Sequence, residues 1–118
     1  MRQWIRQRAQ MLFPGIISDL SSRTGLEFRR LSIRSQKTRW GSCSSSGNIS
    51  LNDQLLFMPP DCVEYLIIHE LCHTRHMNHG NAFWRLVEAH CPQYRQHERN
   101  LAQSKNWIPD WYLLDLYR

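Results

Sequence analysis

The sequence predicts an α+β fold in one domain of 118 residues, with a small antiparallel sheet packed beside helices. Two changes of pattern along the chain support this prediction. Apolar residues recur at helical spacing over residues 2–22 and then alternate with polar residues over residues 26–52. From about residue 60 the spacing is helical again, so the sheet is expected between two helical regions.

An N-terminal helix is expected over residues 2–22. Pro14 is predicted to break or kink this helix, or to begin a second one, because proline lacks the N–H of the helical hydrogen bond. Gly25 is the expected stop, since glycine readily adopts the left-handed conformation that ends helices. The apolar residues at helical spacing are Trp4, Ile5, Met11, Leu12, Ile16, Ile17 and Leu20.

Three extended segments are expected to form the sheet. The stretch LEFRRLSIRS, residues 26–35, alternates with one slip at its two arginines, which predicts a strand with a bulge. TRWGSCS and NISLN, residues 38–44 and 48–52, predict two more strands, joined by the turn-rich SSSGN. Asn52 is expected to cap a turn or to hold this hairpin together.

The C-terminal half is predicted to be helical. A helix over about residues 60–76 is expected to begin at Pro60 and Asp61, because both are favoured in the first helical turn. In the region that follows, His90 and His97 are expected at the surface. The helices expected within residues 80–117 are 81–90, 92–105 and a short docked helix after Pro109.

Composition predicts a cytoplasmic protein with no membrane partner. No apolar run approaches the roughly 18 residues needed to cross a bilayer, and the N-terminal stretch MRQWIRQRAQ is too charged for a secretory signal. The four cysteines include no C-x-x-C pair and are predicted to be reduced, mostly buried thiols. The formal charge of +5 favours anionic partners and makes nucleic acid a candidate.

The stretch IIHELCHTRHMNHGNAFW contains an H-E-x-x-H string in an otherwise apolar helix. His69 and His73 are four residues apart, so their rings lie on one helical face and can converge on one ion. Glu70 is turned by about 100° from His69, which suits a general base that takes a proton from zinc-bound water. Because unpaired polar groups are costly in an apolar helix, a metal site is favoured over satisfied core histidines.

A catalytic zinc site needs a third protein ligand. His76 is seven residues beyond His69, about 10.5 Å along an unbroken helix, which is too far for a tetrahedral site. The third ligand is therefore expected after the chain turns at MNHG, residues 77–80. His79 is ranked first, Glu88 second and His76 third.

The segments KTRWGSCSSSGNISLN, EYLIIHELCHTRHMNHGNAFW and CPQY resemble the YgjP-like metallopeptidase domain family, over about residues 26–101. The resemblance implies a zincin-like fold, in which a small antiparallel sheet lies beside the active-site helix. It also implies that His69 and His73 are the first two zinc ligands. By the same motif match, Glu70 corresponds to the general base and His79 to the third ligand.

The sequence thus predicts a zinc-dependent hydrolase, most simply one that acts on a peptide or protein substrate. Arg39, Trp40 and Gly41 are the candidate substrate-binding residues, because they are expected on the strand next to the active-site helix. The first alternative is a metal-dependent nucleoside-triphosphate pyrophosphohydrolase, an activity associated with some proteins of this pattern. It would use Arg34, Lys37 and Arg39 on phosphates. The second is a nucleic-acid-binding module with a structural zinc.

Overall fold

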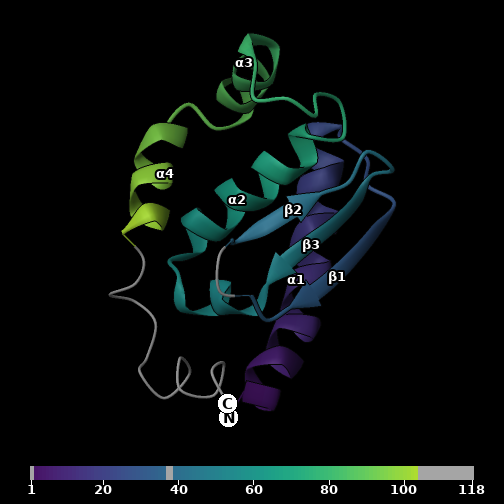
Figure 1. The fold of residues 1–118 in the computed structure, drawn as a ribbon, viewed down its shortest axis with the longest axis vertical. Coiled ribbons are helices and arrows are strands. Elements are labelled where there is room, and N and C mark those ends of the chain that lie inside the picture. Colours follow the sequence, from purple (N-terminus) through teal and green to yellow (C-terminus); the bar gives the residue numbers. More distant parts are fainter. Residues whose placement is uncertain (1, 37–38, 104–118) are drawn as a thin grey trace.

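The structure is a computed structural model that describes residues 2–36 and 39–103. Its elements surround a three-stranded sheet (Figure 1). None of the helices in the described ranges is long and apolar enough to cross a membrane. The helix expected after Pro109 lies outside the described residues. In chain order, the elements are α1 (Arg2–Thr24), β1 (Arg30–Arg34), β2 (Gly41–Cys43), β3 (Asn48–Asn52), the 3-10 helix η1 (Asp53–Phe57), α2 (Pro60–Cys72), α3 (Asn81–His90) and α4 (Tyr94–Ala102).

The sheet is mixed, which corrects the expectation of a purely antiparallel one. Its spatial order is β1-β3-β2, with β2 antiparallel to β3 and β1 parallel to β3. The chain reverses direction twice, at the entry to β2 and again at Gly47, so β3 returns in the direction of β1 and lies between the other two strands. Sequence alternation identifies the buried face of a strand but not its direction, and this is why the expected antiparallel direction was wrong for β1.

The predicted hairpin is confirmed. Gly47 adopts φ 84°, and its N–H donates to the Ser44 carbonyl at 3.0 Å. Glycine is favoured there because side chains clash in the left-handed region. The strand expected from residue 26 begins only at Arg30, and the predicted bulge is absent from β1 as the structure describes it. Leu26 is instead buried in the core as the chain leaves α1.

Helix α1 continues through Pro14, so the predicted break at this residue was wrong. The Pro14 side chain is exposed, while Phe13 and Ile17 on either side of it are buried in the core. We attribute the continuity to this packing, which offsets one missing backbone hydrogen bond. The helix ends as expected at Gly25, which has φ 73° and donates its N–H to the Ser21 carbonyl at 2.9 Å.

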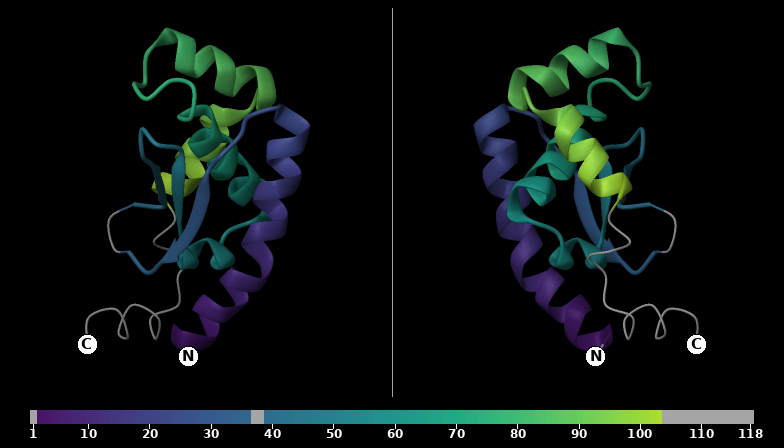
Figure 2. Two further views of the ribbon diagram at one scale, coloured as in Figure 1. Left: turned by 90° about the vertical axis from the view of Figure 1, so that its right-hand side faces the viewer. Right: turned by 90° about the vertical axis from the view of Figure 1, so that its left-hand side faces the viewer.

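The helices α1 and α2 cover one face of the sheet, as the two side views in Figure 2 show. Ile49 and Leu51 point from β3 into this layer and are fully buried. The other face is polar: Arg34 donates to the Ser50 hydroxyl at 3.1 Å. A single core therefore lies between the sheet and the helices, and α2 passes directly behind β2 and β3.

Candidate metal centre

Three histidine rings converge where α2 ends. The helix stops at Cys72, four residues earlier than expected, and His73 forms its C-cap. The chain then turns, and His79 returns to the end of the helix from the loop before α3. Its Nε2 atom lies 3.1 Å from Nε2 of His73 and 3.4 Å from Nε2 of His69.

This arrangement fits a zinc ion. Two nitrogen ligands on a tetrahedral zinc are about 3.3 Å apart, because each lies roughly 2.0–2.1 Å from the metal. The ligand atoms of His69, His73 and His79 all lie within 4.8 Å of one another. Three imidazoles also match the nitrogen donors that zinc prefers.

Hydrogen bonds on the far side of two rings orient their lone pairs toward the common centre. The Nδ1 atom of His73 lies 2.9 Å from the His76 carbonyl oxygen, which can only accept. Nδ1 must therefore carry the proton, and Nε2 of neutral His73 has a free lone pair. The Nδ1 atom of His69 likewise faces Tyr65 and Glu98, at 3.0 Å from the hydroxyl and 3.5 Å from the carboxylate. Lone pairs that face one another in this way require a proton or a cation between them.

Aromatic side chains of α3 stack on two of the three rings. Phe83 stacks on His73 with centroids 4.3 Å apart, and Trp84 stacks on His79 at 5.7 Å. Burial and, to a smaller extent, the neighbouring His73 and His79 together lower the pKa of His69 to about 3. Burial also lowers the pKa of His73. At neutral pH both rings are therefore neutral, which is the state that binds a metal.

The Glu70 carboxylate lies beside this centre in a tight space. Its side chain is buried, with 4% of its surface exposed. Burial raises its pKa to about 7; the positive charge of Arg39 opposes this shift and the negative charge of Glu98 adds to it. A Cβ atom at Gly41 would lie 3.3 Å from the Glu70 Oε2 atom. The predicted general base thus adjoins strand β2.

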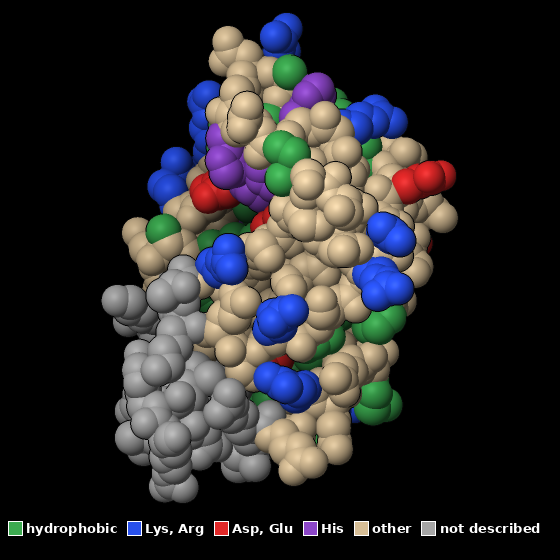
Figure 3. Space-filling model, turned by 45° about the vertical axis from the view of Figure 1, so that its right-hand side comes forward, with side chains coloured by type: hydrophobic (Ala, Val, Ile, Leu, Met, Phe, Trp, Pro, Cys, Tyr) green, Lys and Arg blue, Asp and Glu red, His purple; other side chains and the backbone are tan. Residues whose placement is uncertain are grey.

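A cleft of about 560 Å³ opens over these groups. In Figure 3, histidine side chains gather beside a hollow with carboxylates next to them. Asn52 helps to hold the rim of the cleft, because its amide donates to the Arg39 carbonyl at 2.9 Å. The cleft contains all three predicted substrate-binding residues. Its lining consists of Arg39, Trp40, Gly41, Leu66, His69, Glu70, His79, Trp84, Glu98, Leu101 and Ala102.

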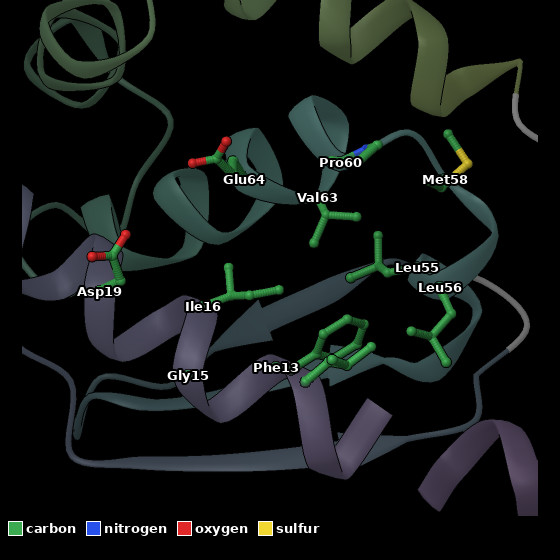
Figure 4. Close-up of a pocket in the computed structure, with 11 residues that line it drawn as sticks. Phe13, Gly15, Ile16, Asp19, Leu55, Leu56, Met58, Pro60, Val63 and Glu64 are labelled. Atoms are coloured by element: carbon green, nitrogen blue, oxygen red, sulfur yellow. The ribbon is translucent and has the colours of Figure 1, made fainter. Parts of the chain in front are cut away.

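A second groove, of about 580 Å³, lies between α1 and the segment from η1 to α2 (Figure 4). Asp19 and Glu64 stand at its edge, and the rest of its lining is apolar apart from Gly15. It contains neither histidine nor cysteine, and its two carboxylates alone do not supply the three protein ligands of a catalytic zinc site. The cleft beside the three histidines is therefore the candidate site.

Comparison with known proteins identifies the family. The family model described as YgjP-like, metallopeptidase domain, matches residues 1–104. The chain belongs to this family. Membership in the YgjP-like family supports a hydrolase of the metallopeptidase type and implies a divalent metal. No functionally curated protein matches the sequence.

Two solved structures share the fold of this YgjP-like chain. The metallopeptidase zymogen of Pyrococcus abyssi abylysin has 23% identity and a TM-score of 0.70, and the match covers 80% of this chain and 96% of that one. The zymogen of Methanocaldococcus jannaschii jannalysin has 20% identity and a TM-score of 0.66, with 77% and 94% covered. The zincin-like α+β fold expected from the sequence is thereby confirmed.

Other predicted participants lie away from the centre. Glu88 is exposed on α3, in a pocket beside Arg85, and His76 presents its backbone carbonyl rather than its ring to His73. Arg34 lies on the polar face of the sheet, and Lys37 is outside the described residues. A phosphate-binding group of arginines is therefore not assembled in the described part of this YgjP-like domain.

Sequence reasoning missed two residues and misplaced one. Tyr65 and Glu98 contact His69, and neither was among the predicted site residues. The spacing of Tyr65 and His69, four residues apart on one helix, was an available signal for their contact. His97, expected at the surface, is buried and stacks on Tyr65 with centroids 5.6 Å apart.

Proposed function

We propose that this chain is a zinc-dependent metallopeptidase, with the zinc held by His69, His73 and His79. The observation that carries the proposal is the convergence of three Nε2 atoms at 3.1 and 3.4 Å beside a buried carboxylate. Two of the ligands come from one helical turn and the third from the loop that follows. This leaves the side toward the cleft open for a water molecule and a substrate.

A bound zinc would act as a Lewis acid and lower the pKa of water. Glu70 would accept a proton from the attacking water and deliver it to the leaving amine. Its pKa of about 7, raised chiefly by burial, suits a group that must both take and return a proton near neutral pH. The small residue at position 41 leaves room for the carboxylate at this place.

Strand β2 suits an extended peptide substrate. It lies at one edge of the three-stranded sheet, so its outer backbone groups face no other strand of this sheet, and Gly41 at its start lines the cleft. A peptide can add to such an edge through main-chain hydrogen bonds. Gly41 permits close approach of its backbone, and exposed Arg39 offers a guanidinium to a substrate carboxylate.

The test combines elemental analysis with a peptide-library assay of the wild type and three variants. We expect about one zinc per wild-type chain. Glu70→Gln should retain the zinc and lose about 10²–10⁴-fold in activity, because only the proton acceptor is removed. His79→Ala should lose the zinc as well. Glu88→Gln, an exposed carboxylate of α3, is the matched control and should behave as wild type.

Either of two results would contradict the proposal. A purified wild type that binds no divalent metal at the histidines would exclude the site. Full peptidase activity in Glu70→Gln would exclude the assigned proton acceptor.

A further inference from the structure

The side of His69 that points away from the three-histidine centre faces two polar groups from different helices. Tyr65 lies one turn earlier on α2, and its hydroxyl oxygen is 3.0 Å from Nδ1 of His69. Glu98 comes from α4, with one carboxylate oxygen 3.5 Å from the same nitrogen. The Tyr65 hydroxyl also donates a hydrogen bond to that carboxylate oxygen. Glu98 therefore lies on the opposite side of the ring from the proposed metal.

The direction of these hydrogen bonds follows from a count of protons. A tyrosine hydroxyl has one proton, and here it is given to Glu98. The hydroxyl oxygen can then only accept from His69, so Nδ1 of His69 carries the hydrogen. Neutral His69 has one ring proton, and its Nε2 is consequently left with a lone pair 3.4 Å from Nε2 of His79. The pair selects the tautomer that a metal requires at Nε2.

Packing fixes the orientation of this pair. The Tyr65 side chain is fully buried, and its ring stacks on His97 with an interplanar angle of 21°. His97 is itself buried, and its Nδ1 lies 3.8 Å from the sulfur of Cys62. Since His97 and Glu98 are adjacent residues of α4, one turn of that helix holds both the ring and the hydroxyl of Tyr65 in place.

We propose that Tyr65 and Glu98 act in series as positioning residues that fix the tautomer and orientation of His69 for zinc. This inference rests on the proposed zinc site. Hydrogen-bond partners of metal-bound histidines typically contribute 10–100-fold to metal affinity. α4 thus contributes to the metal site without supplying a ligand.

The test measures the zinc dissociation constant by chelator competition in Tyr65→Phe, Glu98→Gln and the double variant. Tyr65→Phe should bind zinc about 10–100-fold more weakly, because it removes the acceptor for His69 and keeps the buried ring. Glu98→Gln keeps the size of the side chain but removes its charge, and it should show a smaller loss in the same direction. The double variant should lose little more than Tyr65→Phe, since the two groups act in series.

A second measurement separates positioning from general destabilisation. Two-dimensional ¹H–¹⁵N spectra of the imidazoles report which nitrogen is protonated in the metal-free protein. Wild-type His69 should carry its proton on Nδ1, and Tyr65→Phe should shift population to the Nε2-protonated form. The matched controls are Tyr94→Phe, whose ring stacks on Trp84, and Glu64→Gln, whose carboxylate pairs with Arg23. Both should leave zinc affinity and the His69 tautomer unchanged.

Zinc affinity and a His69 tautomer unchanged from wild type in Tyr65→Phe would overturn the inference and leave the zinc site intact. If Tyr65→Phe does not fold, two other results together would overturn the inference. These are a zinc affinity of Glu98→Gln equal to that of the wild type and a wild-type His69 protonated on Nε2. A wild type that binds no zinc would overturn the proposed function, and this inference with it.

Discussion

The residue at position 41 sets the space available to the Glu70 carboxylate. A Cβ atom there would lie 3.0 Å from the backbone oxygen of Ser50 and 3.3 Å from Glu70 Oε2. The backbone of β3 is held by both neighbouring strands, so the carboxylate is the group that can move. Glycine at this position therefore leaves room for the carboxylate of the proposed general base.

We expect Gly41→Ala to lower kcat by about 10–100-fold while zinc remains bound. The reason is that a displaced carboxylate no longer lies in line with the water it must deprotonate, and errors of about 1 Å can cost 100-fold. Zinc content and peptidase kinetics measured on the same preparation check this. Gly15→Ala, which places a Cβ in open space on α1, is the control. Loss of zinc from Gly41→Ala would show that the residue serves the metal site instead.

The residues of the site differ in how far sequence could predict their positions. His69, Glu70 and His73 are fixed relative to one another by helical spacing alone. The approach of His79 depends on a turn, which the run from Met77 to Gly80 indicates but does not specify in three dimensions. Glu98 lies 33 residues from Tyr65, and no local pattern predicts that long-range contact.

Among the elements, helices were predicted more accurately than strand pairing. The helix Asn81–His90 has the predicted bounds, because its apolar spacing and its flanking turn residues agree. Helix α2 ends at Cys72 rather than near residue 76, since the chain must turn for His79 to reach the other rings. The direction of β1 depends on the order in which the strands enter the sheet, and the sequence of one strand does not contain that information.

Helix α1 offers a test in which one substitution should have opposite effects at two positions. Gly15 is exposed within the helix, and a Cβ there meets nothing within 4 Å. Gly15→Ala should therefore stabilise the protein by about 0.5–1 kcal/mol. Gly25 ends the helix at φ 73°, where a side chain is strained, so Gly25→Ala should destabilise it by roughly 1 kcal/mol. Urea unfolding of both variants measures the difference; a stabilising Gly25→Ala would contradict this account.

For the molecule as a whole, burial of the ionisable groups of the site lowers the free energy of unfolding of the metal-free protein. Glu70, His69 and His73 are ionisable groups packed against an apolar core. Burial disfavours the charged form of each group, so it raises the pKa of the carboxyl and lowers the pKa values of the rings. A zinc ion that binds only the folded state offsets this cost by mass action. Chelation of the metal should consequently lower Tm.

The stability of the metal-free protein should depend on pH in a way that Glu70→Gln reveals. The pKa of Glu70 is raised from 4.5 in the unfolded chain to about 7 in the folded one. Between these values the folded state binds more protons, so this group contributes stability below pH 4.5 that is lost as pH rises through 7. His69, with its pKa lowered to about 3, produces a slope of the opposite sign, and the wild-type curve alone does not isolate Glu70.

Subtracting the free energy of unfolding of the wild type from that of Glu70→Gln removes the contribution of the histidines, which both proteins share. Between pH 4 and pH 8 this difference should increase by roughly 3 kcal/mol, with the variant becoming the more stable protein. The reason is that a shift of one pKa unit corresponds to about 1.4 kcal/mol. Urea unfolding at several pH values, with chelator present throughout, measures it. A difference that stays constant with pH would show that the Glu70 carboxyl keeps its ordinary pKa in the folded protein. With zinc present, the difference in free energy of unfolding should increase less with pH, because a nearby cation favours the ionised carboxylate.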